Sequence, residues 1–254
     1  MTEFYKQIVQ ELKVLLQPNE SIISAWEGGS AATGFLDEYS DLDLALIVKD
    51  DAIEETFELI EDYLDDRYGI KNKFRMPEPS WHGHSQIFCI LENAPEFFYV
   101  DLLIEKESAE NRFTESDRHG NSIIWFDKKN LIDSTPTPQD VVNEKCKHSY
   151  LLMKQYIPFT IIDIKKQIKR GNSIDALAIY NGFMNRFIML LNIKYRPSKF
   201  DFGLRYTYRD LPENEVGFLE SVMFVENLDD LQKKFSKVER KIKELLDVLD
   251  KDFI

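Results

Sequence analysis

The spacing of apolar residues changes along this sequence from the short period of strands to the longer period of helices. Up to about residue 134, short runs such as Asp41–Val48 and Phe97–Ile104 alternate or are continuously apolar, and two helical segments lie among them. From about residue 140, apolar residues recur every three or four positions almost to the end. We therefore predict an α+β chain, in which a mixed β-sheet with flanking helices is followed by a bundle of about five helices.

The change of period coincides with Asp-Ser-Thr-Pro-Thr-Pro at 133–138, which is typical of a stiff linker. This segment predicts two domains, 1–134 and 135–254. The first contains 12 Lys and Arg against 28 Asp and Glu, and the second contains 20 against 17. An acidic half joined to a slightly basic half indicates two domains with different electrostatic tasks, although most of these carboxylates are expected to be solvated surface groups.

The individual elements follow from the same patterns. A helix over 3–16 is expected behind Thr2 as its N-cap, and a second helix over Ala52–Tyr68. The predicted strands are Ser21–Trp26, Asp41–Val48, Ile70–Phe74, Ser85–Leu91, Phe97–Ile104 and Ile123–Phe126. The predicted helices of the second half are about 140–156, 158–170, 173–193, 212–223 and 228–252.

Composition excludes several classes of protein. The net charge of −13 argues against nucleic-acid binding, which needs a basic surface. No apolar run approaches the ~20 residues of a membrane span, and the N-terminus lacks a signal-peptide layout. Cys89 and Cys146 are expected to be buried thiols, because two cysteines without CxxC spacing form neither a disulfide framework nor a zinc site. We expect a cytoplasmic protein without membrane contact.

Gly28-Gly29-Ser30 lies between a predicted strand and a probable helix. Glycines allow a phosphate to approach the backbone closely, and the serine hydroxyl adds a donor. Many tight turns have this sequence, so the segment alone is weak support for a phosphate site.

Three carboxylates follow in predicted strands. Asp41 and Asp43 stand two residues apart, so they point to one face about 7 Å apart and repel each other unless a cation lies between them. Asp101 lies within an apolar strand, where a carboxylate is costly to bury without a partner. Either it pairs with a cation or it joins the other two around a metal ion.

Gly29-Ser30, a spacer of ten residues, Asp41-x-Asp43 and a later strand with Asp101 together resemble the DNA polymerase β-type nucleotidyltransferase superfamily. The two-domain layout resembles the branch that modifies aminoglycoside and lincosamide antibiotics. The resemblance implies that 1–134 is the catalytic domain, that 135–254 binds the acceptor, and that the active site lies in the cleft between them. It implies transfer of a nucleoside monophosphate from ATP or another nucleoside triphosphate to a hydroxyl group.

The resemblance also implies the role of each residue. Gly29 and Ser30 would bind the β- and γ-phosphates, and Asp41 and Asp43 would bind Mg²⁺. Asp101 would be a third metal ligand or the base that accepts the hydroxyl proton. Glu105, about 13 Å from Asp101 along the same strand face, is a weaker candidate base.

In the second half, cations are expected to assist the triphosphate, with Lys147 as the principal candidate and solvation as the alternative for each. The irregular stretch Lys194–Leu211 is rich in basic residues, for which the same alternatives hold, and in aromatic residues that either stack on a base or an acceptor or hold a loop against the core. His82 and His84 lack further ligands for zinc.

Other functions compatible with this sequence are nucleotidylation of a protein or tRNA, as in toxin–antitoxin relatives, and nucleotide binding without catalysis. The sequence leaves the acceptor, the nucleobase and the oligomeric state open, a homodimer included.

Overall fold

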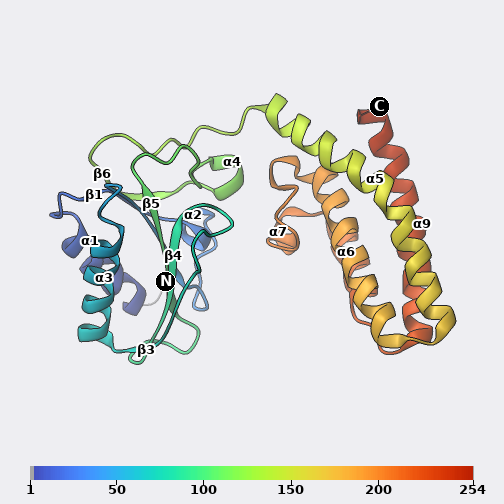
Figure 1. The fold of residues 1–254 in the computed structure, drawn as a ribbon, viewed down its shortest axis with the longest axis horizontal. Helices are drawn as coiled ribbons and strands as arrows, with labels where there is room; N and C mark the ends of the chain where they lie inside the picture. Colours follow the sequence, from blue (N-terminus) through green and yellow to red (C-terminus); the bar gives the residue numbers. More distant parts are fainter. Residues whose placement is uncertain (1–2, 254) are drawn as a thin grey trace. The chain divides into compact units, whose positions relative to one another are not determined.

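The computed structural model describes residues 3–253, so the expected N-cap at Thr2 lies outside the described part. The chain divides into two compact units, Met1–Pro136 and Thr137–Ile254. The first contains a mixed sheet with helices and the second is helical, so the predicted α+β class is confirmed (Figure 1).

The first unit builds a six-stranded sheet in the order β3-β4-β5-β2-β1-β6. Strands β2 and β5 are parallel, and the other neighbouring pairs are antiparallel. Its elements are α1 (Glu3–Leu16), β1 (Ile22–Glu27), α2 (Gly29–Ala32), β2 (Leu42–Val48), α3 (Ile53–Tyr68), β3 (Ile70–Arg75), β4 (Ser85–Leu91), β5 (Tyr99–Lys106), α4 (Ser116–His119) and β6 (Ile123–Asp127).

The continuous apolar run of β2 has both of its faces covered. Leu44 and Leu46 belong to the larger core, which includes buried residues of α1 and α3. Ala45 and Ile47 face a smaller cluster with Trp26, against which part of the segment after β6 packs. A central strand buried on both sides therefore loses the alternation of a half-buried strand.

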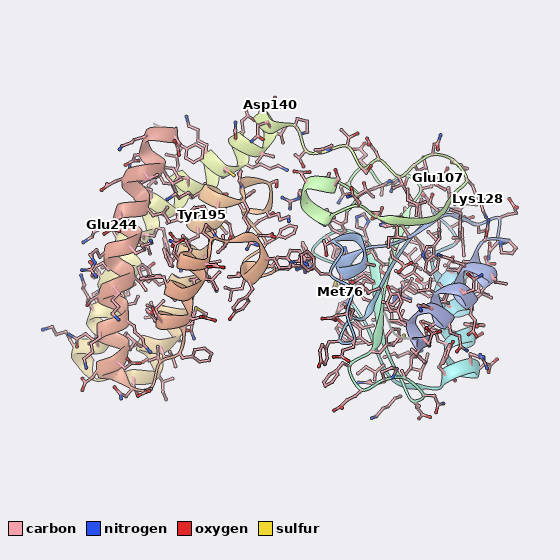
Figure 2. All side chains as sticks on the ribbon, turned by 180° about the vertical axis from the view of Figure 1, so that it is seen from behind. Met76, Glu107, Lys128, Asp140, Tyr195 and Glu244 are labelled. Carbon is pink, nitrogen blue, oxygen red and sulfur yellow. The ribbon has the colours of Figure 1, made fainter. Side chains whose placement is uncertain are left out.

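The second unit consists of α5 (Gln139–Arg170), α6 (Ser173–Tyr195), η1 (Pro197–Lys199), α7 (Thr207–Asp210), α8 (Glu213–Met223) and α9 (Leu228–Phe253). Figure 2 labels Asp140 at the start of α5, Tyr195 at the end of α6 and Glu244 on α9. Side chains of α5, α6, α8 and α9 form one apolar core, in which Cys146 is a buried thiol, as Cys89 is in the first unit.

The prediction of separate helices over 140–156 and 158–170 is wrong, because α5 continues through Pro158. A proline inside a helix removes one backbone hydrogen bond and costs about 3 kcal/mol. Burial offsets this cost, since Met153, Ile157, Thr160 and Ile164 keep the helical spacing on both sides of the proline and are all buried.

Within residues 3–253, none of the helices has both the length and the apolar character of a membrane span.

Candidate active site

Asp43 and Asp101 stand side by side on the parallel strands β2 and β5, as directly opposed residues of the ladder. Neighbouring strands lie about 4.8 Å apart, so the two side chains emerge close together on one face of the sheet. Asp41 comes two residues before Asp43, and all three aspartates are half-buried. Strand pairing thus joins carboxylates that are far apart in the sequence.

Tyr99, at the start of β5, connects this group further. Burial is the main reason that the pKa of Tyr99 lies well above its ordinary value, followed by the neighbouring Asp41 carboxylate and then by the charges of Asp101 and Asp43. All three carboxylates therefore lie close enough to the Tyr99 hydroxyl to raise its pKa. Sequence reasoning missed Tyr99, although its position two residues before Asp101 places it on the same face.

Gly29 packs directly against Asp43. Its φ of +49° lies in the left-handed region, and a Cβ at this position would lie 1.7 Å from Asp43 Oδ2. The Gly28 amide donates to the Asp43 carbonyl oxygen over 2.9 Å, which holds the start of α2 beside β2. Only glycine fits here, because a side chain would displace the carboxylate.

The Ser30 hydroxyl, next along the chain, is a buried polar atom without a hydrogen-bond partner among residues 3–253. Leaving such a group unpaired costs about 1–3 kcal/mol, so an unpaired hydroxyl next to an acidic cluster calls for an explanation. A hydroxyl can donate to a phosphate oxygen, which is the role expected for Ser30 from the sequence.

Gln86 on β4 donates from Nε2 to Asp101 Oδ1 over 2.6 Å. The partner that the sequence left open for Asp101 thus includes a neutral amide. Sequence reasoning missed Gln86, because the register of β4 against β5 is set by tertiary pairing.

Behind Gly28 the chain buries a further acid, Glu27. Its two carboxylate oxygens accept hydrogen bonds of 2.7 Å from the Tyr5 hydroxyl and from Trp125 Nε1. The pKa of Tyr5 is raised, mainly by burial, then by Glu27, and further by the charges of Asp43 and Asp41. Glu27 is therefore hydrogen-bonded by two neutral donors and, like Asp41 and Asp43, raises the pKa of Tyr5.

Glu105 does not fit the alternative role of base. It is fully buried, and its Oε2 accepts a hydrogen bond from Arg112 over 3.1 Å. Burial raises the pKa of Glu105 to about 7, against the opposing effect of Arg112. Because no part of this residue is exposed, it cannot meet an acceptor hydroxyl in this structure.

The histidines of the loop before β4 are buried within the first unit. Their rings pack against each other and against Phe113, at centroid distances of 5.5–5.8 Å. Burial lowers the pKa of His84 to about 4, so its ring is neutral at pH 7.

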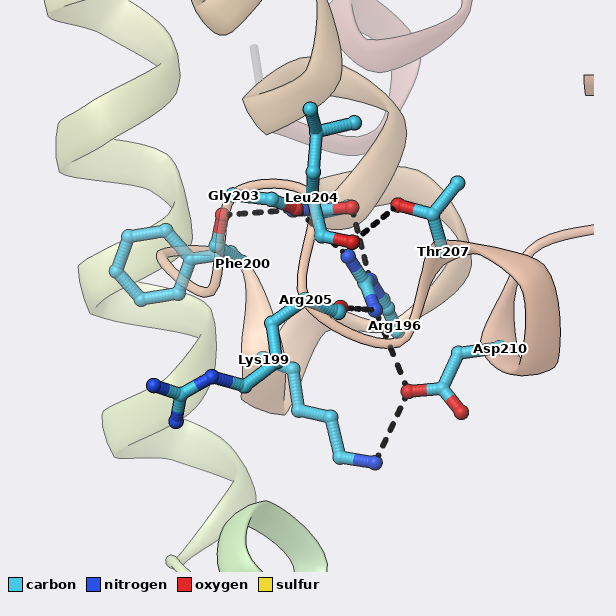
Figure 3. A network of polar contacts seen from close by, with 9 residues as sticks. Arg196, Lys199, Phe200, Gly203, Leu204, Arg205, Thr207 and Asp210 are labelled. Atoms are coloured by element: carbon cyan, nitrogen blue, oxygen red, sulfur yellow. Dashed lines mark hydrogen bonds and ion pairs between the residues drawn. The ribbon is translucent and has the colours of Figure 1, made fainter. Parts of the chain in front are cut away.

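The basic residues considered for the triphosphate differ in their exposure and in their partners. Lys147 is exposed on α5, and its role toward a triphosphate stays a prediction. Arg196 is buried and donates to the carbonyl oxygens of Gly203 and Arg205, while Lys199 pairs with Asp210 (Figure 3). The network in Figure 3 therefore holds the irregular stretch before α8 together, and Arg196 is buried rather than solvated, as its alternative had it.

Among residues 3–253, no group of three or more His, Cys, Asp or Glu side chains is arranged to hold a metal ion by itself. The three aspartates share a face, but the assignment of three protein ligands to one ion remains a prediction.

No curated protein matches the sequence. The crystal structure of a nucleotidyltransferase-like protein from Exiguobacterium sibiricum is similar, with 13% identity and a TM-score of 0.37, over 96% of this chain and 73% of that chain. Residues 6–96 match the family model described as nucleotidyltransferase domain. These residues include Gly29, Ser30, Asp41 and Asp43 but end before Asp101. Residues 6–96 therefore match a nucleotidyltransferase domain, a domain of enzymes that transfer a nucleoside monophosphate from a nucleoside triphosphate.

Proposed function

We propose that this chain transfers a nucleoside monophosphate from ATP or another nucleoside triphosphate to a hydroxyl group of a small polar acceptor. The observation that carries the proposal is the packing of the Asp43 carboxylate against Gly29, next to the unpaired buried hydroxyl of Ser30. The glycine backbone that lies against Asp43 would let a phosphate approach, and the Ser30 hydroxyl would donate to it. The family match over residues 6–96 supports the same reaction class.

The donor set also suits magnesium. Asp41 and Asp43 offer carboxylate oxygens, which are the ligands that this hard ion prefers. Magnesium in phosphoryl-transfer sites is commonly held by one or two carboxylates together with substrate phosphates. Two protein carboxylates are therefore sufficient. When bound, the ion would offset the charge of the triphosphate and polarise its phosphoryl oxygens.

The remaining work falls to residues of the chain. Ser30 would donate to a phosphate oxygen, and Gly29 would allow the phosphate to approach the backbone. The acceptor oxygen forms a bond to the α-phosphorus as the bond to pyrophosphate breaks. Asp101, which is next to Asp43, would either take the proton of the acceptor hydroxyl or act as a further metal ligand. Most of the rate enhancement would then come from positioning and electrostatics.

For the acceptor, aminoglycoside and lincosamide antibiotics are the first candidates to test. The acidic first unit, with 28 Asp and Glu against 12 Lys and Arg up to residue 134, favours a cationic or neutral acceptor over tRNA. We retain the second unit as the proposed acceptor-binding domain, with Lys147 as a candidate contact to the triphosphate, and the cytoplasm as the proposed location.

The test is pyrophosphate release by the purified protein with Mg²⁺ and each of the four ribonucleoside triphosphates, with and without pooled antibiotics. Asp43→Asn removes one carboxylate charge at nearly constant shape and is expected to lower turnover at least 100-fold. Asp51→Asn, at an exposed position of the same unit, is the matched control and should be fully active.

Each outcome points to one function. Acceptor-dependent release that is lost in Asp43→Asn supports the transfer to a small molecule. If the antibiotics leave pyrophosphate release unchanged while radioactive nucleotide labels a protein or tRNA from a cell extract, the result would favour a macromolecular acceptor. Magnesium-dependent nucleotide binding without any consumption would indicate a non-catalytic domain, and equal turnover in Asp43→Asn and wild type would refute the site.

A further inference from the structure

A chain of hydrogen bonds leads from the loop before β4 to Asp101. The His84 amide donates to His82 Nδ1 over 3.2 Å, and His82 Nε2 lies 3.1 Å from Gln86 Oε1. Gln86 Nε2 in turn donates to Asp101 Oδ1 over 2.6 Å. All of these residues belong to the first unit.

The backbone amide of His84 determines which atoms donate and which accept along this series of hydrogen bonds. An amide N–H can only donate, so Nδ1 of His82 has to accept, and the neutral ring carries its proton on Nε2. The Gln86 atom that faces Nε2 is then the carbonyl oxygen, which leaves the amide nitrogen to donate to Asp101. Ser80 Oγ, 3.4 Å from the same Nδ1, does not compete as a donor, because it donates to the His84 carbonyl oxygen over 2.5 Å.

The His82 ring is packed among aromatic side chains. The His82 ring is 8% exposed and lies between Trp81, His84 and Phe113, at centroid distances of 5.0–5.8 Å. The His82 carbonyl oxygen also accepts a hydrogen bond from Asn111. A buried ring with fixed neighbours keeps its orientation, so it can orient the amide that follows it.

We propose that Gln86 is a positioning residue for the transfer reaction and that His82 sets its orientation, so that a neutral donor holds the Asp101 carboxylate beside Asp43. This proposal rests on the proposed function. The Gln86 amide fixes one oxygen of the Asp101 carboxylate and brings no charge of its own to the site. Loss of the Gln86 contact is expected to affect the reaction step, because a misplaced Asp101 carboxylate lowers the rate more than the binding of substrate.

The kinetic test compares Gln86→Leu, which removes the donor, with Gln86→Glu, which keeps the shape but replaces the donor by a like charge. Both should lower kcat at least tenfold while the KM for the triphosphate changes less than threefold, and Gln86→Glu should be the lower of the two. His82→Phe keeps the aromatic packing and should lower kcat several-fold, whereas His82→Gln, which again offers a donor, should recover most of it. Gln10→Leu, at an exposed position on α1, is the matched control.

A second readout does not depend on turnover. The ¹⁵N resonances of His82 in the wild-type protein should show a protonated Nε2 and an unprotonated Nδ1. A ring protonated on Nδ1 would reverse the chain and overturn the proposal.

Different results would refute the positioning role and the proposed function. If wild type releases pyrophosphate, Asp43→Asn does not, and the Gln86 variants keep the wild-type kcat, the positioning role is refuted and the proposed function stands. If the wild type has no turnover with any acceptor, the proposed function fails and the positioning role fails with it. A loss of kcat that parallels a loss of thermal stability in all four variants would show a merely structural role.

Discussion

The carboxylate of Asp43 occupies the space that a side chain at position 29 would need, since a Cβ on Gly29 would lie 1.7 Å from Asp43 Oδ2. The Gly28-Gly29-Ser30 turn and Asp43 are therefore packed against each other. The glycine is needed both for its backbone conformation and for this close approach.

Gly29→Ala is expected to abolish turnover, because the new methyl group must displace the Asp43 carboxylate. Gly34→Ala provides the control, since Gly34 also has a positive φ, of +73°, but nothing lies within 4 Å of its Cβ position. Both variants should lose a similar free energy of unfolding from backbone strain, about 1–2 kcal/mol. Pyrophosphate release should separate them, and equal activities of the two variants would contradict the packing argument.

Ser30→Ala tests the unpaired hydroxyl. Removal of a buried group without a partner should leave the free energy of unfolding unchanged or raise it by about 1 kcal/mol. The KM for the triphosphate should rise roughly tenfold, as expected for one lost hydrogen bond to a charged phosphate. Ser24→Ala is the contrast, because the buried Ser24 hydroxyl donates to Asp127 Oδ1 over 2.7 Å. It should cost stability and leave the KM unchanged; a stability loss in Ser30→Ala would show that its hydroxyl is paired.

Glu105 predicts a dependence of stability on pH. Burial raises its pKa to about 7 from the ordinary value of 4.5, so the folded state holds the proton more tightly than the unfolded chain. The stabilising contribution is thus complete below pH 4.5 and is lost as the pH rises to about 7.

Between pH 4.5 and pH 8, wild type should lose up to about 3 kcal/mol of unfolding free energy relative to Glu105→Gln. Arg112 keeps partners in this variant, since it also donates to the carbonyl oxygens of Lys106 and Glu107. Urea unfolding at the two pH values measures the difference, and Glu58→Gln, at an exposed site, should behave as wild type. Parallel pH dependences of wild type and Glu105→Gln would argue against the raised pKa.

Pro158→Ala should stabilise the second unit by about 1–3 kcal/mol, because alanine restores a helical hydrogen bond in α5. Pro158 is exposed, so no core contact is lost. Chemical unfolding measures the change, with Gln155→Ala as a control on the same helix that should shift stability by less than about 0.5 kcal/mol. A destabilised Pro158→Ala protein would mean that the proline is favoured by the native backbone.

The sequence by itself determined the order of strands and helices, the change from an α/β unit to a helical one, and the short list of aspartates around a Gly-Ser turn. These features are local: side-chain periodicity, turn residues and the spacing of Asp41 and Asp43 are set within a few neighbouring positions.

Only the tertiary structure decided which distant residues meet. The pairing of β2 with β5 places Asp101 beside Asp43, and the pairing of β4 with β5 brings Gln86 to the same carboxylate. Strand register depends on contacts between segments far apart in the chain, so a local pattern cannot supply it. The same holds for Glu105, whose burial removes it from the candidate bases, and for Pro158, where packing on both sides outweighs the local preference for a break.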